Sequence, residues 1–171
     1  DSSRGKILLV TGASRGIGAA IARGAARAGW RVVVNYARDA RAAERVVGEI
    51  ESAGGEALAL QGDVAREDDV LRLFQEIDRR FGRLDVLVNN AGIGLSSRLE
   101  HHSLEDWNQV IAVNQTGVFL GIRSVVAPMT ERGGGSIVNI SSGAGLRATK
   151  YMIAYAASKY AVTGMTASAA L

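Results

Sequence analysis

The sequence predicts an α/β fold in which a doubly wound parallel sheet carries helices on both faces. Three observations indicate this. Strand-like and helix-like segments alternate strictly, residues 32–34 and 86–88 form continuous apolar runs, and a glycine-rich turn follows the first strand. Unbroken apolar runs are typical of parallel strands that are covered on both faces. With 171 residues and 47% hydrophobic residues, we expect one domain spanning residues 1–171.

Five strands and five helices are expected along the chain. The predicted strands are residues 6–10, 31–35, 56–61, 86–89 and 136–140, and the predicted helices are residues 16–28, 41–53, 67–81, 104–131 and a last helix from 152. We expect residues 103–106 to form a capping box at the start of the long fourth helix, and residues 132–135 to form a turn. A doubly wound dinucleotide fold commonly has six strands, so we expect the last strand or strands to be missing from this chain.

The glycine-rich turn, residues 11–18, lies directly between the first strand and the first helix. Gly12, Gly16 and Gly18 permit a tight turn and a close approach of the backbone to a phosphate. The free N–H groups and the positive dipole end of the helix then attract the anion. The alternative is an ordinary strand-to-helix turn that is rich in glycine. Its position between strand and helix favours nucleotide binding and a Rossmann-type sheet.

Tyr155 and Lys159 are four residues apart in the last predicted helix. Residues at this spacing share a helix face, with Cβ atoms about 5–6 Å apart. A tyrosine normally ionises near pH ~10, and an adjacent ammonium favours the phenolate, so the pair can exchange a proton nearer to working pH. Tyrosine and lysine occur at this spacing on many helices, so the catalytic interpretation depends on the phosphate-binding turn as well.

Taken together, these motifs resemble the short-chain dehydrogenase/reductase family over nearly the whole chain. The pattern is most similar to the 3-oxoacyl-carrier-protein reductase and glucose dehydrogenase members. The matching positions are the TGxxxGxG loop at residues 11–18, the NNAG turn at residues 89–92, the helix asparagine at Asn114, the catalytic serine at Ser142, and the YxxxK pair at Tyr155 and Lys159. The resemblance implies a single dinucleotide-binding and catalytic domain.

The resemblance also implies a division of roles. Tyr155 would exchange a proton with a carbonyl or alcohol oxygen, Lys159 would assist it and bind the nicotinamide ribose, and Ser142 would hydrogen-bond the substrate oxygen. Asn114 would hold a helix bend and a water that leads protons to Lys159. On the residues alone, Ser142 could belong to a polar turn and Asn114 could simply bend a long helix. The implied cofactor-binding residues are Gly12, Ser14, Arg15, Gly16, Ile17, Gly18, Tyr36, Arg38, Asp63, Val64, Asn90, Ala91, Gly92, Tyr155 and Lys159.

The end of the second strand indicates the cofactor. NAD enzymes of such folds carry an acidic residue there, which binds the ribose hydroxyls and repels a 2′-phosphate. Tyr36 stands at that position, and Arg15 and Arg38 offer positive charge to a phosphate, so we expect NADP(H) to be preferred over NAD(H). The alternative is that both arginines are merely solvated, with Asp39 offsetting Arg38. The pair at residues 63–64 resembles the adenine-contacting pair, or else begins a helix.

Composition narrows the remaining classes. The net charge is +3, but 20 basic and 17 acidic residues are interspersed, so no nucleic-acid partner is expected. There is no cysteine, and no apolar run reaches the ~20 residues of a membrane span, which indicates a soluble, cytoplasmic protein. His101 and His102 are adjacent and would point apart, so we expect them to be surface loop residues and expect no metal site.

Three functional classes remain open from the sequence. The first is an NADP(H)-dependent carbonyl reductase or alcohol dehydrogenase, the second an epimerase or dehydratase that uses a bound nucleotide, and the third a nucleotide-binding member without turnover. A small-molecule carbonyl or alcohol is the expected partner, and the resemblance implies a homo-oligomer, a dimer or tetramer. The candidate substrate-lining segments are residues 93–96, 145–147 and 151–152.

Overall fold

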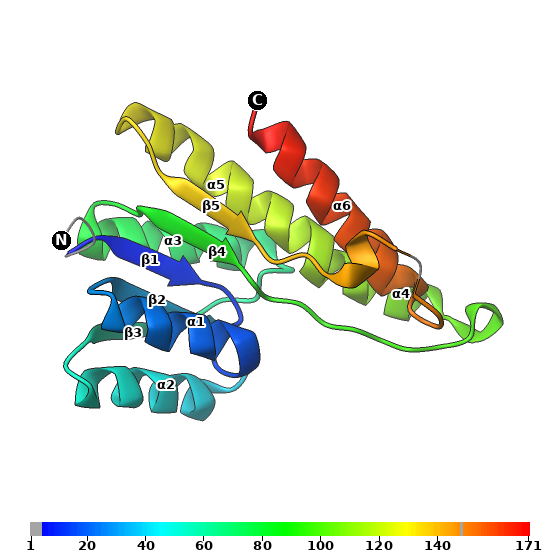
Figure 1. Ribbon diagram of the computed structural model, residues 1–171, viewed down its shortest axis with the longest axis horizontal. Coiled ribbons are helices and arrows are strands. Elements are labelled where there is room, and N and C mark those ends of the chain that lie inside the picture. Colours follow the sequence, from blue (N-terminus) through cyan, green and yellow to red (C-terminus); the bar gives the residue numbers. More distant parts are fainter. Residues whose placement is uncertain (1–4, 148) are drawn as a thin grey trace.

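The computed structural model describes residues 5–147 and 149–171. They contain one five-stranded sheet with strand order β3-β2-β1-β4-β5 (Figure 1). All four strand pairings are parallel. This is the strand order of a doubly wound sheet, in which the order reverses between β1 and β4 and opens a crevice beyond the carboxyl ends of these strands. The strands are β1 (Ile7–Val10), β2 (Arg31–Tyr36), β3 (Glu56–Gln61), β4 (Val86–Asn89) and β5 (Ser136–Asn139).

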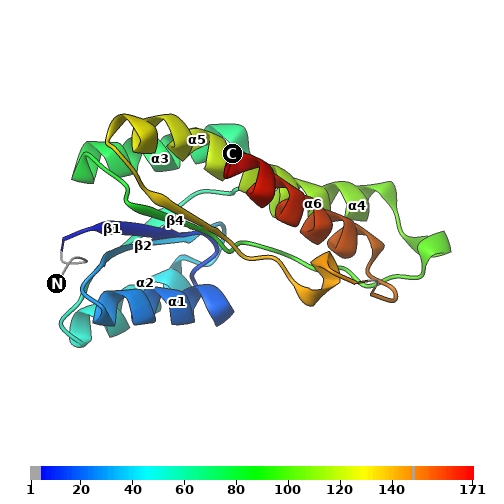
Figure 2. The same cartoon turned by 45° about the horizontal axis from the view of Figure 1, so that its top comes forward.

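Helices cover both faces of the sheet, as expected. Figure 2 shows α1 and α2 below the sheet and α3, α4, α5 and α6 above it. The α-helices are α1 (Gly16–Arg27), α2 (Ala40–Ser52), α3 (Glu67–Phe81), α4 (Leu104–Ile111), α5 (Gly117–Glu131) and α6 (Ile153–Ala169). Short helical turns, η1 (Leu99–His101), η2 (Ala112–Thr116) and η3 (Gly143–Gly145), lie between them.

The alternating side chains of each strand build a separate core on each face. Val10 and Val34 are paired across β1 and β2, and they pack with Ala22 of α1 on one side of the sheet. Leu9 and Leu87 point to the other side and pack with α3 and α5. Because both faces are covered, a strand such as β2 can be apolar at every position from 32 to 34, which is the pattern that predicted it.

The predicted long helix over residues 104–131 is interrupted. A π-helical turn, η2, separates α4 from α5 and contains the fully buried Asn114. π-turns inside helices are often associated with functional sites. Within the described residues, this segment is also the one helix long and apolar enough to cross a membrane by length and composition. Here its Val125 and Met129 pack into the core with Leu9 and Leu87.

The remaining boundaries agree with the sequence to within one residue. Ser103 caps α4 as predicted, because its Oγ accepts the Asp106 N–H at 3.0 Å. The turn at residues 132–135 also joins α5 to β5 as expected, with positive φ at Gly133 and Gly134. The last helix begins at Ile153 rather than Met152, and β5 ends at Asn139 rather than at residue 140.

Candidate active site

A hollow of about 800 Å³ lies at the carboxyl ends of the strands, in the crevice that the strand order creates. Its lining comes from the loops after all five strands together with α4, η2 and α6. Every residue predicted to bind the cofactor lines this hollow except Gly18. The fold thus brings together segments that are more than 140 residues apart in the chain, from Gly12 to Lys159.

The glycine turn has the backbone geometry that its sequence predicted. Gly12 and Gly16 have φ values of +62° and +57°, a region that side chains other than glycine rarely adopt. A Cβ on Gly12 would lie 2.8 Å from Ala91 Cα, and a Cβ on Gly18 would lie 2.5 Å from Asn90 Nδ2. A Cβ on Gly16 would meet no atom of the described chain within 4 Å. Gly12 and Gly18 therefore allow close packing, whereas Gly16 borders open space.

The first turn of α1 offers unsatisfied N–H groups to the hollow. Its N-cap residue is Arg15, whose side chain makes no capping hydrogen bond to the helix. The first N–H groups of a helix have no intrahelical partner, and with the helix dipole they favour an anion. The end of α1 has the features of a phosphate-binding site, with Gly16 as its first residue.

The turn after β4 is hydrogen-bonded to the glycine turn. Thr11 Oγ1 accepts the N–H groups of Asn90 and Ala91, each at 3.0 Å. In return, Asn90 Nδ2 donates to the Thr11 carbonyl at 2.9 Å. These bonds cross the point where the strand order reverses, so they hold the two sides of the crevice at a set separation.

Arg15 and Arg38 are both exposed, and they line the same hollow as Tyr36. Arg15 and Arg38 form no ion pair with any described residue. Asp39 instead caps α2, because its Oδ1 accepts the Ala42 N–H at 2.9 Å. Both guanidinium groups are thus available to an anionic ligand.

Asp63 and Val64 also line the hollow. Asp63 Oδ1 accepts the Ala65 N–H at 3.0 Å in the turn before α3, while the N-cap of α3 is Arg66. Asp63 therefore shapes the turn and does not cap the helix.

Tyr155 and Lys159 line the hollow from α6, where they lie one helical turn apart. Lys159 Nζ is 5.7 Å from the centre of the Tyr155 ring and donates to the Ile140 carbonyl at 2.7 Å. The lysine is only 4% exposed. Burial lowers the pKa of Lys159 below its ordinary value, since a desolvated ammonium is disfavoured. A phenol and a buried ammonium thus line the same cavity as the glycine turn.

Asn114 does not line the hollow but connects two of its walls. Its amide exchanges two hydrogen bonds with the Ile93 main chain, each at 2.8 Å, and its Nδ2 donates to Ser158 Oγ at 3.1 Å. Ser158 Oγ in turn donates to the Tyr155 carbonyl at 2.7 Å. Asn114 therefore links the loop that follows Gly92 to the helix that carries Tyr155.

Ser142 lies at the start of η3, where its Oγ accepts the Ala144 N–H at 3.2 Å and caps the turn. This is the polar-turn arrangement that the residues alone allowed. Its O–H can still donate, so a role toward a substrate oxygen stays a prediction. Ser141, which the sequence did not single out, lines the hollow and donates to the Lys159 carbonyl at 3.0 Å.

The substrate-lining segments were predicted only in part. Ile93, Gly94 and Met152 line the hollow, and a Cβ on Gly94 would lie 3.1 Å from Met152 Cε and 3.5 Å from Tyr155 Cδ2. The other lining residues were not predicted to line the site, because no local pattern shows that the fold carries them to the cavity. They are Asn35, Ala37, Asp39, Gly62, Gln109, Val113, Ile140 and Ser141. The predicted Leu95, Ser96, Gly145, Leu146, Arg147 and Tyr151 are outside the lining.

The two histidines differ in how far their side chains are exposed. His101 is exposed, but His102 is half-buried, and neither of its ring nitrogens has a hydrogen-bond partner among the described residues. His102 directly precedes Ser103, the N-cap residue of α4. The sequence did not indicate that these two adjacent residues differ in exposure.

These geometric features accord with the comparisons to known proteins. A sequence model of the family described as short chain dehydrogenase matches residues 6–171. The chain belongs to this family. It is therefore a short-chain dehydrogenase/reductase, an enzyme of a class that acts on CH–OH and C=O groups with a nicotinamide cofactor.

Several relatives of this short-chain dehydrogenase have been described. A 3-oxoacyl-acyl-carrier-protein reductase of Synechocystis is 47% identical over 165 residues, which cover 96% of this chain and 67% of the relative. A 3β-hydroxysteroid dehydrogenase of Eggerthella lenta is 42% identical over 100% of this chain and 66% of its own length. A crystal structure of a metagenomic short-chain oxidoreductase in complex with NADP is 41% identical. It superposes with a TM-score of 0.95 over 99% of this chain and 77% of the other.

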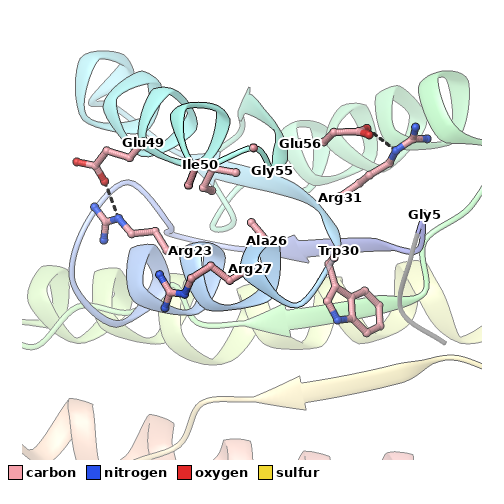
Figure 3. Close-up of a pocket in the computed structure, with 13 residues that line it drawn as sticks. Gly5, Arg23, Ala26, Arg27, Trp30, Arg31, Glu49, Ile50, Gly55 and Glu56 are labelled. Atoms are coloured by element: carbon pink, nitrogen blue, oxygen red, sulfur yellow. Dashed lines mark hydrogen bonds and ion pairs between the residues drawn. The ribbon is translucent and has the colours of Figure 1, made fainter. Parts of the chain in front are cut away.

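The chain has a second groove, of about 720 Å³, at the opposite end of the sheet near the amino ends of β2 and β3. Figure 3 shows Arg23 paired with Glu49 and Arg31 paired with Glu56, each at 2.5 Å. None of the predicted site residues lines this groove. The hollow at the carboxyl ends of the strands is therefore the candidate active site.

Proposed function

We propose that this chain is an NADP(H)-dependent oxidoreductase that interconverts a carbonyl and a secondary alcohol, with Tyr155 as general acid and base. The observation that carries the proposal is that Tyr155, Lys159 and the glycine turn all line the same hollow. A dinucleotide fits this hollow at one end through Gly16 and the open first turn of α1. Its reactive end would then lie near Tyr155. One domain would combine cofactor binding with catalysis.

The nicotinamide, when bound, supplies or accepts the hydride. The chain supplies the proton and the geometry. Tyr155 donates its phenolic proton to the carbonyl oxygen during reduction and takes the proton of the alcohol during oxidation. Lys159, whose ammonium is held against the Ile140 carbonyl, stabilises the phenolate that remains on Tyr155. Ser142 would donate to the substrate oxygen, and Asn114 would keep the Ile93 segment and α6 in register.

We infer a preference for NADP(H) from the charge near the end of β2. Arg15 and Arg38 are exposed, line the hollow and lack acidic partners among the described residues, and Tyr36 puts no carboxylate beside them. A guanidinium binds a phosphate through charge-assisted hydrogen bonds. The related metagenomic oxidoreductase, crystallised with NADP, supports the same preference.

The substrate is a small carbonyl or alcohol compound, and the names of the relatives suggest which to test first. They include 3-oxoacyl-acyl-carrier-protein reductases and a 3β-hydroxysteroid dehydrogenase. The Ile93, Gly94 and Met152 side of the hollow is apolar enough for an acyl chain or a steroid ring. We also propose that the protein is cytoplasmic and forms a homo-oligomer, as a dimer or tetramer, without nucleic-acid or membrane partners.

The test is the change in nicotinamide absorbance when NADPH or NADP is mixed with the protein and a substrate panel. The panel contains 3-oxoacyl thioesters, hydroxysteroids and their ketones, and sugars. Stoichiometric, substrate-dependent oxidation of NADPH or reduction of NADP supports the proposal. Product formation without net cofactor change would indicate an epimerase or dehydratase. Nucleotide binding with no product from any substrate would indicate a member without turnover.

A further inference from the structure

Asn35 is a buried polar residue near the end of the apolar strand β2. Its side chain is 1% exposed, and β2 lies between β1 and β3 in the sheet. Transfer of an amide from water into a protein interior is unfavourable unless its hydrogen bonds are replaced. The adjacent positions 32–34 are valines, so an apolar residue at position 35 would continue the packing of the strand. The contacts of Asn35 explain its presence.

The amide of Asn35 bonds to both neighbouring loops. Its Oδ1 accepts the Gly12 N–H at 3.3 Å, which belongs to the glycine turn after β1. Its Nδ2 donates to the Gly62 carbonyl at 3.0 Å and to the Leu60 carbonyl at 3.3 Å, at the end of β3. The main-chain carbonyl of Asn35 also accepts the Ala13 N–H at 2.8 Å. One residue thus joins the phosphate-binding turn to the loop that continues into Asp63 and Val64.

We propose that Asn35 is a positioning residue for the adenosine-phosphate half of the cofactor. It sets the distance between the glycine turn, which faces the phosphates, and the Gly62–Val64 loop, which faces the adenine. This inference rests on the proposed function in one respect, that the hollow binds a nicotinamide dinucleotide. Asn35 itself lines the hollow but acts through the loops that it holds.

The chemistry of the position favours asparagine over residues of similar size. Gly12 presents an N–H and Gly62 presents a carbonyl, so the side chain between them must accept on one atom and donate on the other. A carboxamide does both on one short planar group. Aspartate lacks the donor, leucine lacks both functions, and serine is too short to reach both loops. Loss of the amide would leave the two loops tied only through the main chain of β2.

The test compares nucleotide binding by the wild type and Asn35→Ser. Calorimetry with 2′,5′-ADP and with ADP-ribose measures the adenosine half alone, because neither probe contains nicotinamide. We expect the Kd of the preferred probe to rise roughly tenfold, as loss of about one hydrogen bond would give. In the full reaction the KM for NADPH should rise in proportion. The kcat at saturating cofactor should stay within about twofold, because the Tyr155 end is untouched.

Ile77→Val is the matched control for general loss of stability. Ile77 is 2% exposed on α3, packs in the core with Leu9 and Leu87, and does not line the hollow. Its substitution should lower Tm without changing either Kd. Three results would each overturn the inference. The first is an unchanged Kd in folded Asn35→Ser, and the second is an equal loss of probe affinity in Ile77→Val. The third is a fall in the kcat of Asn35→Ser at constant KM. Asn35→Leu provides a second variant, with the same number of side-chain heavy atoms and no hydrogen-bonding group.

The two proposals fail in distinguishable ways. If the wild type binds 2′,5′-ADP or ADP-ribose but converts no substrate, the proposed function fails while the Asn35 inference is still decided by the Kd values. If the wild type converts substrate and Asn35→Ser binds both probes like the wild type, only the Asn35 inference fails. If the wild type binds neither probe, both are overturned.

Discussion

Lys159 lies in an environment unlike that of an ordinary, solvent-exposed lysine. Its ammonium is buried and bonded to the Ile140 carbonyl at 2.7 Å. Since burial lowers its pKa below the ordinary 10.5, the folded chain binds this proton less tightly than the unfolded chain. The charge therefore reduces stability at neutral pH, and the reduction is lost as pH rises from the lowered pKa to 10.5. A destabilising charge beside Tyr155 is consistent with a functional role.

Replacement of Tyr155 by phenylalanine tests the proton transfer. Tyr155→Phe deletes the phenolic oxygen and little volume, so the fold and the affinity for NADPH should be nearly unchanged. We expect kcat to fall by roughly 10²–10⁴, the usual effect of losing a general acid. Steady-state kinetics together with calorimetry checks both parts. Wild-type kcat in this variant would refute the role of Tyr155, and Tyr160→Phe, at an exposed position on α6, is the matched control.

Tyr36→Asp tests the cofactor preference. The new carboxylate would repel a 2′-phosphate and accept hydrogen bonds from a free ribose. The wild type should favour NADPH over NADH, and high salt should reduce that advantage because Arg15 and Arg38 are exposed. In the variant the ratio of kcat/KM for the two cofactors should reverse, by about tenfold or more for each charge-assisted contact that is lost. Equal use of both cofactors by the wild type would contradict the two-arginine argument.

At the scale of elements, the junction of β1 and α1 determines whether a nucleotide can bind. Gly16 is the first residue of α1, has φ of +57°, and faces open space. A side chain here would both strain the backbone and occupy the space that a phosphate needs. Gly24 lies farther along the same helix, and its Cβ would also meet no described atom within 4 Å, but its φ is not positive.

We therefore expect Gly16→Val to abolish nucleotide binding, with a backbone penalty of about 1–2 kcal/mol for a side chain in the left-handed region. Gly24→Ala is the matched control and should bind nucleotide normally. It should also be more stable by roughly 0.5–1 kcal/mol, since alanine in a helix interior is favoured over glycine. Calorimetry and thermal unfolding of both variants check this. Unchanged affinity in folded Gly16→Val would exclude the turn as the phosphate site.

A second element-scale feature is the amino end of the sheet, where Asp85 bonds β4 to β1. Its Oδ2 accepts the Ile7 N–H at 2.8 Å, and Arg83 Nε donates to it as well. Burial acts to raise the pKa of Asp85, but the hydrogen bonds from Arg83 and Ile7 outweigh it and hold the pKa below 3.8. The ionised form is therefore stabilised by folding, and this contribution is present above pH 3.8 and lost as pH falls through the lowered pKa.

Asp85→Asn should lower the free energy of unfolding by about 1 kcal/mol at pH 7, the difference between a charged and a neutral hydrogen-bond acceptor. The difference from wild type should shrink as pH falls below 3.8. Urea unfolding at several pH values measures this. Asp78→Asn, at an exposed position with no ion pair among the described residues, should have a much smaller effect. A constant difference down to low pH would contradict the assignment.

For the whole molecule, the cofactor hollow draws on every strand of the described sheet, so ligand binding should stabilise the fold as a unit. At a free NADPH concentration of 100 times Kd, linkage predicts about 2.7 kcal/mol of added stability. For a chain of this size that corresponds to a rise in Tm of about 5–10 °C. Thermal unfolding with and without NADPH checks it. No shift in wild type, or an equal shift in Gly16→Val, would contradict binding in this hollow.

Most of the fold could be predicted from the sequence because its signals are local. The apolar runs of β2 and β4 and the amphipathic spacing of α3 occur within single segments, and so does the cap at Ser103. The interruption of the long helix at Ala112–Thr116 was not predictable as a π-turn. Its Asn114 is held by Ile93 and Ser158, which are 21 and 44 residues away.

By itself, the sequence determined the sheet class, the glycine turn and the spacing of Tyr155 and Lys159, because each depends on residues that are close in the chain. Only the tertiary structure decided which of two adjacent serines lines the hollow, which of two adjacent histidines has buried ring nitrogens, and that Asn35 joins two loops. Burial and hydrogen bonding at these positions depend on strands that the chain brings together from far apart. No local pattern can specify them.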